Sequence, residues 1–387
     1  MNMTKFAAKE DPGFTLVSGQ LQRWVREIEA TVTTEHPLVA SGLSASRATV
    51  GATPRHVMTA VRRDSTYRRP PNSEFRVAII CALPVEAEAV AAHFDQRLDE
   101  GLPYHKADGD RNAYTCGIMG GHFVVVVHPP GAGKVRATDA VNDCKRSFPK
   151  INLAIVAGVC GAVPFVSAPG GVKQEIVLGD IIISTSVIQH DLGRLKSDGF
   201  KMKDGLKDAL GPPPESISSL LAKLKTDAGL REAMMGHMDE DRLTAIYPGA
   251  SEDMLFEETY DHANENATCS TSCDTSKLIP RHRLEQQTQR PRPLIHFGAV
   301  ASGDTVMMLG TQRDKLSKEL QVVAFEMEGA GVWRNLPCLV IKGASDYADS
   351  HKLKSFQPYA AATAAACTRA ILDYWAATRS ATGPWCG

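Results

Sequence analysis

The chain has 387 residues, in which 43 lysines and arginines balance 44 aspartates and glutamates to a formal net charge of -1. This near-neutral balance argues against a surface built to neutralise phosphates, so we expect no nucleic-acid partner. Hydrophobic residues make up 43% and charged residues 22%, which excludes collagen-like, coiled-coil and wholly disordered chains and leaves an enzyme or a globular binding module.

The first residues, 1–74, are predicted to form an N-terminal arm. Between positions 41 and 72 six arginines stand against one acid, Asp64, with Ser, Thr and Pro between them. Residues 20–33 have the pattern of a short amphipathic helix. A flexible arm is the favoured interpretation, and a contact arm for a partner or an anionic surface is the alternative.

From Phe75 onward the apolar pattern alternates between strand and helix periods. Strands are expected at 75–81, 152–156, 180–184, 294–301, 322–325 and 338–343, with a hairpin at 114–127 around Gly120-Gly121. Helices are expected at 85–94, 134–147, 216–225, 312–320, 329–335 and 356–378. This alternation predicts an α/β fold with a central mixed, mainly parallel sheet flanked by helices.

The polar, turn-rich residues 236–293 interrupt this alternation. We interpret them as an internal insertion that covers the core of one catalytic domain, residues 75–378. Residues 379–387 are assigned to a C-terminal tail.

Targeting and redox signals favour a cytoplasmic protein. No apolar run approaches the roughly 18–20 residues that span a bilayer, so no membrane association is expected. The start of the chain has no apolar core of a secretory signal. The nine cysteines are an odd number and several lie in apolar runs, which favours a reducing compartment.

Cys269 and Cys273 are the one close cysteine pair. No second pair with metal-ligand spacing accompanies them, so a loop thiol pair is favoured over a zinc site. We therefore predict neither a metal nor a cofactor.

Several short segments place glycine and acidic residues where predicted strands end, which is where ligands gather in open α/β sheets. They are residues 79–86 (IICALPVE), 156–163 (VAGVCGAV), 323–330 (VAFEMEGA) and 341–346 (IKGASD). A further segment, Gly131-Ala132-Gly133-Lys134, is not a phosphate-binding Walker loop, because the earlier glycine is missing and Val135 replaces the Ser or Thr.

Together with residues 131–135, 178–181 and 301–304, these segments resemble the purine nucleoside phosphorylase/nucleosidase superfamily. The resemblance keeps the same order over about residues 75–378, and residues 345–352 and 358–363 resemble its fungal branch. It implies a single phosphorylase/hydrolase-like domain that acts on a small purine nucleoside. It also implies a homo-oligomer, with a dimer favoured.

The resemblance implies roles for particular residues. Asp346 matches the general acid that protonates the leaving base, and Glu328 matches the carboxylate that holds the ribose hydroxyls. Glu86 matches the glutamate that activates water in the methylthioadenosine/S-adenosylhomocysteine nucleosidases. The implied substrate-binding set is completed by Met327, Glu326, Val159, Cys160, Gly161, Met307 and Ser345.

Structural alternatives accompany these roles. Asp346 with Ser345 could cap a turn, and Glu86 suits the first turn of a helix. Glu326 is as readily structural as functional. If the backbone is extended there, Glu326 and Glu328 share one face and influence each other's ionisation.

The nucleophile is expected to be water. Hexameric phosphorylases of the family carry phosphate-binding Arg and Ser at the positions of Val156 and Val159, whose side chains cannot donate hydrogen bonds. Hydrolysis of the N-glycosidic bond to a free base and ribose, or 5′-substituted ribose, is therefore favoured. A phosphate-dependent phosphorylase and a non-catalytic nucleoside-binding or signalling module remain as alternatives, the latter because related fungal domains are fused to immune-receptor-like proteins.

Substrate details stay open in the sequence. Thr305-Val306-Met307 stands where methylthioadenosine-type enzymes place an aromatic ring, so base stacking would come from Met307, Met327 or an aromatic residue elsewhere, for which Phe165 is a candidate. His190-Asp191 either borders the sugar site or is a plain loop pair. His351 and Lys352 are interpreted as a solvated turn.

Overall fold

The computed structural model describes residues 69–167, 173–197, 199–203, 210–239, 245–264, 267–285, 292–352 and 354–379. The chain divides into two compact units, Met1–Ser65 and Thr66–Gly387, and every described residue belongs to the second. The helix predicted at 20–33, most of the predicted arm and nearly all of the tail lie outside the described residues.

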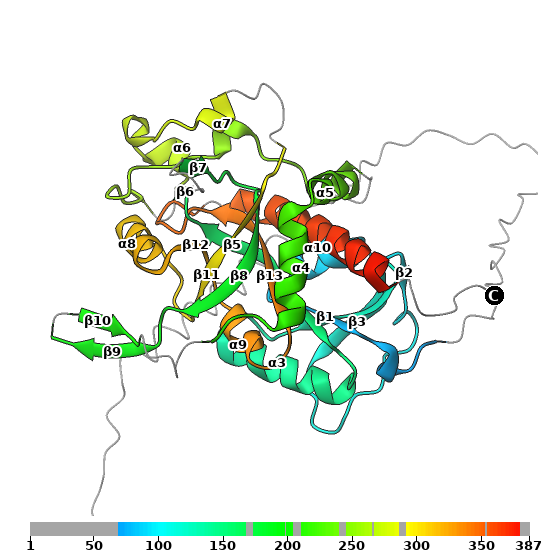
Figure 1. The fold of residues 1–387 in the computed structure, drawn as a ribbon. Helices are drawn as coiled ribbons and strands as arrows, with labels where there is room; N and C mark the ends of the chain where they lie inside the picture. Colours follow the sequence, from blue (N-terminus) through cyan, green and yellow to red (C-terminus); the bar gives the residue numbers. More distant parts are fainter. Residues whose placement is uncertain are drawn as a thin grey trace, which may run out of the picture. The chain divides into compact units, whose positions relative to one another are not determined.

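The second unit is built on a mixed sheet in the order β12-β11-β8-β13-β5-β1-β4-β3-β2 (Figure 1). In that order the strands are Val322–Glu326, Ile295–Ser302, Ile181–Gln189, Cys338–Asp346, Leu153–Ala162, Val77–Ile80, His122–His128, Ala113–Met119 and Gln96–Arg97. The central pairs, β4 with β1, β1 with β5 and β5 with β13, are parallel, as are β8 with β11 and β11 with β12. The predicted α/β class and mainly parallel sheet are confirmed.

An extra antiparallel pairing bends one half of the sheet back on itself. Ala324 and Phe325 of β12 pair with Ala162 and Gly161 of β5. Because β12 also continues the row β11-β8-β13-β5, these five strands form a closed ring. The ring brings the end of β12 against the end of β5, two segments that are about 160 positions apart in the sequence.

Helices cover both faces of the sheet (Figure 1). The helices of the described residues are α2 (Pro84–Ala92), α3 (Lys134–Ser147), α4 (Glu215–Thr226), α5 (Gly229–Asp239), α6 (Cys269–Ser272), α7 (His282–Glu285), α8 (Gly310–Leu320), α9 (Gly329–Trp333) and α10 (Gln357–Arg379). The short 3₁₀ turns are η1 (Asn72–Glu74), η2 (Ala250–Glu252), η3 (Thr275–Lys277) and η4 (Lys354–Phe356).

Strand β1 shows how the period of two divides the core. Val77 and Ile79 pack with residues of α2, α4, α5 and α10, whereas Ala78 and Ile80 pack with residues of α3 and α9. All four residues are fully buried, as expected for a central strand of a parallel sheet.

The predicted hairpin is present with the predicted turn. Met119 of β3 lies opposite His122 of β4, and Gly120 and Gly121 between them have φ values of 59° and 74°. Two consecutive positive φ values are what a tight two-residue hairpin turn requires, and glycine adopts them without steric cost.

Three strands are longer than predicted: β5, β8 and β13 continue to Ala162, Gln189 and Asp346. The predictions ended them early because glycines and polar residues follow the apolar runs. A small hairpin of β9 (Gly193–Lys196) and β10 (Gly199–Met202), and the short pair β6 (Phe165–Ser167) with β7 (Lys173–Glu175), were not predicted at all. Their residues lack a continuous apolar pattern, and Leu195 is 84% exposed.

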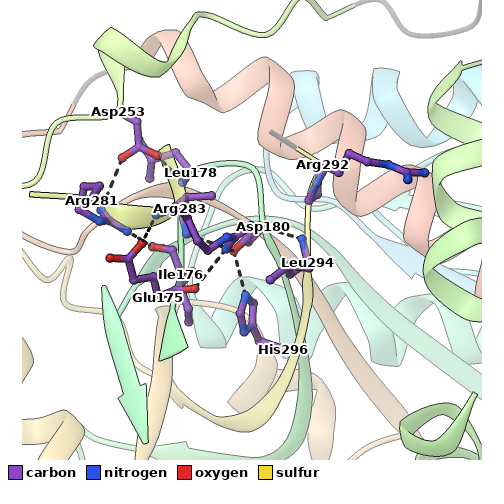
Figure 2. Close-up of polar contacts among 12 residues, drawn as sticks. Glu175, Ile176, Leu178, Asp180, Asp253, Arg281, Arg283, Arg292, Leu294 and His296 are labelled. Carbon is purple, nitrogen blue, oxygen red and sulfur yellow. Dashed lines mark hydrogen bonds and ion pairs between the residues drawn. The ribbon is translucent and has the colours of Figure 1, made fainter. Parts of the chain in front are cut away.

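The described part of the insertion is fixed to the sheet through a buried carboxylate, Asp180, just before β8 (Figure 2). The guanidinium of Arg283 in α7 donates two hydrogen bonds to it, and Nε2 of His296 on β11 lies 2.9 Å away. Burial alone would raise the pKa of Asp180, but the hydrogen bonds from His296 and Arg283 outweigh burial and hold that pKa below its usual range.

A second buried group lies beside the first. Arg281 donates to the hydroxyl of Tyr347 at 2.5 Å and to the carbonyl of Ile176 at 2.5 Å. Tyr347 in turn donates to Asp253, whose other oxygen accepts from the backbone N–H of Leu178. Two residues of the insertion that lie 28 positions apart, Asp253 and Arg281, are therefore both joined to Tyr347 in the loop that follows β13.

Among the described residues, no helix combines the length and the apolar character needed to cross a bilayer.

Candidate active site

A cavity of about 290 Å³ opens where β1, β5, β12 and β13 end. The loop before α8 and residues of the loop after β13 complete its wall. All ten positions that the sequence singled out line it: Glu86, Val159, Cys160, Gly161, Met307, Glu326, Met327, Glu328, Ser345 and Asp346. This placement brings the predicted residues together, while their roles stay predictions.

Glu86 lies in the first turn of α2 with its side chain buried. Its carboxylate accepts hydrogen bonds from the backbone N–H of Val159 at 2.8 Å and of Leu83 at 2.9 Å. A Cβ on Gly158 would lie 1.9 Å from Oε1 of Glu86, so only glycine leaves room for the carboxylate there. Glu86 therefore lies where the helix-turn alternative places it, and the same carboxylate satisfies the N-terminus of α2 and lines the cavity.

Lys342, a fully buried lysine in β13, lies between two carboxylates of the site. Its Nζ is 3.1 Å from Oε2 of Glu328 and 3.8 Å from Oε1 of Glu86. Sequence reasoning missed it, although a lysine inside the apolar run of a strand is itself a signal of a buried partner.

Lys342 and Glu328, together with burial, set the pKa of Glu86. Burial raises the pKa of Glu86 above its usual range, and the nearby Glu328 raises it further, while Lys342 lowers it. Burial alone would lower the pKa of Lys342, but Glu328 and Glu86 outweigh burial and raise it, so the ammonium form persists.

Glu328 and Glu326 have different surroundings. Strand β12 ends at Glu326, and Glu328 has helical backbone angles at the start of α9, so the expectation of one shared extended face is wrong. Glu328 accepts from the N–H of Gly133 at 3.3 Å. Glu326 accepts from the N–H groups of Glu328 and Gly329, which gives its carboxylate a structural role at the start of α9.

The charge of Glu328 acts on the ionisation of Glu326. Burial raises the pKa of Glu326, and the charge of Glu328 raises it further.

Asp346 is the last residue of β13. Its Oδ1 accepts from the N–H of Ala348 and from Nζ of Lys352, both at 2.9 Å, and its Oδ2 accepts from the hydroxyl of Ser345 at 3.1 Å. The bond to Ala348 is the turn contact of the structural alternative. The solvated-turn interpretation of residues 351 and 352 is wrong, because Lys352 lines the cavity and His351 is buried.

The apolar wall of the cavity includes Val159, Met307, Phe325 and Met327. Phe165, the aromatic residue named for base stacking, instead lines a second cavity beside α8. Phe325 is the one aromatic residue among the described residues that line the cavity, and sequence reasoning did not single it out because it precedes Glu326 in an apolar strand.

Asp191 holds the glycine loop 131–134 in place, whereas the ring of His190 lies edge-on to Phe325 with centroids 6.0 Å apart, and neither residue is among the described residues that line the cavity. Asp191 accepts hydrogen bonds from Nζ of Lys134 and from the N–H of Asp304, and Asp304 accepts from the N–H of Lys134 at 2.8 Å. Because the loop supplies the Gly133 amide to Glu328, this network positions Glu328 indirectly.

Comparison with known proteins decides the family. A family model described as the phosphorylase superfamily matches residues 76–373. The chain belongs to this superfamily. The predicted resemblance is confirmed over almost the same span.

Two curated relatives extend the comparison. The chain is 32% identical over 324 residues to a nucleotide-binding leucine-rich repeat (NLR)-like protein of Hyaloscypha variabilis, and this match covers 80% of the chain. The chain spans only 30% of the length of that relative. It is 24% identical over 248 residues to a 5′-methylthioadenosine/S-adenosylhomocysteine nucleosidase of Mycobacterium bovis, covering 58% of the chain and 76% of the relative.

Solved structures are similar at lower identity. Futalosine hydrolase of Helicobacter pylori has a TM-score of 0.49 and 17% identity, and covers 78% of this chain and 98% of its own. The methylthioadenosine/S-adenosylhomocysteine nucleosidase of Streptococcus pneumoniae has a TM-score of 0.47 and 20% identity, and covers 77% and 99%.

The wall of the cavity is rich in carboxyl groups. The carboxyl residues Glu86, Glu326, Glu328 and Asp346 line it, and Lys352 is the single basic residue among the described lining residues. That ammonium is already paired with Asp346. The wall is therefore suited to a neutral ligand, because a bound anion would face an excess of negative charge.

Proposed function

We propose that the chain is an enzyme that hydrolyses the N-glycosidic bond of a purine ribonucleoside, giving the free base and ribose or 5′-substituted ribose. The observation that carries the proposal is the acidic wall: a buried glutamate, Glu86, and an acid at a strand end, Asp346, share one cavity with no unpaired basic residue among its described lining residues. Membership of the phosphorylase superfamily and the nucleosidase relative support it.

Asp346 acts as the general acid in this proposal. It gives a proton to N7 of the purine as the bond from C1′ to the base breaks, so the base leaves neutral. Ser345 fixes one carboxyl oxygen at 3.1 Å, and the Ala348 amide fixes the other. The ammonium of Lys352 also contacts Asp346, and we propose that the purine displaces this ammonium, since the carboxyl group must face N7 to protonate it.

Glu86 acts as the general base. Water attacks C1′, and Glu86 takes its proton while the oxygen forms the new bond to the sugar. The amides of Val159 and Leu83 hold the carboxylate in position. A raised pKa makes the carboxylate a stronger base than an exposed glutamate, which suits proton abstraction near neutral pH.

Glu328 holds the ribose. Its carboxylate accepts hydrogen bonds from the 2′- and 3′-hydroxyl groups and faces the positive charge that develops on the sugar. Lys342 and the Gly133 amide keep it oriented. Phe325, Met327 and Met307 supply the apolar surface for the base and sugar.

A signalling module is the second candidate, and one finding favours it. The match to the NLR-like relative covers 80% of the chain but only 30% of the relative, so in that protein the matched region is one part of a longer polypeptide. The acidic residues Glu86, Glu328 and Asp346 favour catalysis over binding alone, even where the domain is part of a longer polypeptide.

The test is release of the purine from adenosine, inosine, guanosine and 5′-methylthioadenosine in phosphate-free buffer. The proposal predicts release with at least one of them. Asp346→Asn and Glu86→Gln should each reduce kcat by about 10²–10⁴-fold, the usual contribution of an acid or base. Asp139→Asn, which changes an exposed surface aspartate, is the matched control and should keep full activity. Unchanged turnover in Asp346→Asn would refute the assignment of the acid, and binding without any release would favour the signalling module.

A further inference from the structure

Four potential metal ligands converge outside the active-site cavity. His262, Cys269 and Cys273 belong to the insertion, and His351 belongs to the loop after β13. Their Nδ1 and Sγ atoms all lie within 4.8 Å of one another. None of the four is among the residues that line the active-site cavity, so this cluster is a separate feature.

The distances match a tetrahedral arrangement. Zn–S bonds of about 2.3 Å and Zn–N bonds of about 2.0–2.1 Å at tetrahedral angles separate sulfur from nitrogen by about 3.6 Å. The Sγ atoms of Cys269 and Cys273 each lie 3.6 Å from Nδ1 of His351. Nδ1 of His262 lies 3.5 Å from Cys269 Sγ and 3.1 Å from Cys273 Sγ.

The outer nitrogens of both imidazoles are also arranged for metal binding. Nε2 of His351 lies 2.9 Å from the carbonyl oxygen of Tyr260, and Nε2 of His262 lies 3.0 Å from that of Ala267. A hydrogen bond from Nε2 to a carbonyl leaves Nδ1 as the lone-pair nitrogen, which is the usual arrangement around a metal-bound histidine. The His351 ring is also stacked on Phe256, with centroids 4.1 Å apart, so its orientation is fixed by packing.

We propose that His262, Cys269, Cys273 and His351 bind a structural Zn²⁺ ion. Two thiolates and two imidazoles are the ligand set that zinc prefers over Mg²⁺ and Ca²⁺, and two thiolates neutralise its charge. Four protein ligands leave no position for water, so the site is structural rather than catalytic. The sequence favoured a loop thiol pair because the two histidines lie 7 positions before Cys269 and 78 positions after Cys273, outside common zinc-ligand spacings.

The ion would join the insertion to the loop after β13, which holds His351 and Lys352. His351 directly precedes Lys352, whose ammonium contacts Asp346. A metal at His351 therefore ties residues 262–273 to the segment that positions the proposed acid, without touching the substrate cavity.

The experiment measures zinc in the full chain, purified under reducing conditions without chelators, by inductively coupled plasma mass spectrometry. We expect about one zinc per chain. Cys269→Ala, Cys273→Ala and His262→Ala should lose it. Cys116→Ala, which removes a buried thiol of β3, and His282→Ala, which removes an exposed histidine of the insertion, are the matched controls and should keep it.

Two measurements on the unmodified protein guard against variants that fail to fold. Apoprotein loaded with Co²⁺ should show thiolate-to-cobalt charge-transfer bands and the strong visible bands of tetrahedral cobalt. X-ray absorption of the zinc form should give two sulfur and two nitrogen neighbours at about 2.3 Å and 2.0–2.1 Å. The proposal is overturned by wild-type protein that neither carries zinc nor binds added Zn²⁺ or Co²⁺, by equal zinc in the ligand variants and the wild type, or by a Cys269–Cys273 disulfide in the reduced preparation.

Discussion

Lys342 and Glu86 show, at the scale of single residues, how burial prepares a carboxylate for chemistry. The carboxylate is desolvated, which favours its neutral form, and the buried ammonium 3.8 Å away partly restores the ionised form. The balance between these effects decides at which pH Glu86 can accept a proton from water.

Replacing this lysine gives the first prediction at this scale. A base must be ionised to act, so activity falls as the pH drops through the raised pKa of Glu86. In Lys342→Met the ammonium that lowers this pKa is gone, so the acidic limb of the kcat/KM profile should move to higher pH. Lys315→Met, at an exposed lysine, should leave the profile in place. A limb that stays fixed or moves to lower pH in Lys342→Met would contradict the role of Glu86.

The second prediction at this scale concerns Lys352. The ammonium of Lys352, 2.9 Å from Oδ1 of Asp346, occupies a position beside the carboxyl group that the purine must reach. Lys352→Met should therefore lower KM for a responsive nucleoside, because the base no longer has to displace the ammonium. The measurement is kcat and KM of base release, with Lys315→Met as the control that should match the wild type. A KM that rises in Lys352→Met would contradict the displacement and show that the ammonium helps to bind the nucleoside.

At the scale of elements, the contacts of Asp180 decide how the insertion is attached to β8 and β11. Its side chain is fully buried and is bonded to Arg283 and His296, so the charge is fully paired. Breaking one side of a buried pair leaves the other charge uncompensated, which costs about 3–5 kcal/mol.

Asp180→Asn should therefore reduce the free energy of unfolding by about 3–5 kcal/mol in urea titration near neutral pH. Asp139→Asn, at a surface pair 3.8 Å from Arg111, should cost about 0–1 kcal/mol. The pKa of Asp180 is lowered in the folded chain, so its stabilisation is present above the unfolded pKa and is lost as pH falls through the folded one. The difference between wild type and Asp180→Asn should shrink in acid, and equal stabilities at neutral pH would contradict this account of the attachment.

Much of the element order could be predicted because local pattern decides it. The helix at 134–147 has the predicted bounds, and the hairpin turns at the predicted glycines. The lengths of β5 and β13 could not be predicted, because the pairing partners that extend them, such as β12, come from distant segments.

The site divides in the same way. Residues in recognisable motifs, such as Glu86 and Asp346, could be located, since a motif fixes both residue type and place at a strand end. Lys342 and Phe325 were missed because they read as ordinary strand residues. The burial of His351 could not be predicted, because the residues that stack on its ring, Phe256 and Tyr260, lie about 90 positions earlier in the chain.

For the whole molecule, the closed ring of five strands and the insertion converge on one point, the segment from Ser345 to Lys352. The ring places Asp346 beside Gly161, and the insertion contacts Tyr347 and His351. The predicted division into arm, domain and insertion, the dimer and the cytoplasmic location stay predictions.

The most direct test of the central claim, hydrolysis by water, is the identity of the sugar product. A responsive nucleoside would be incubated with the full chain in the absence of phosphate and at saturating phosphate, and the sugar identified by mass spectrometry in ¹⁸O-labelled water. The account predicts ribose carrying one ¹⁸O at C1′, formed at the same rate in both buffers. Strict dependence on phosphate with ribose 1-phosphate as the product would contradict it.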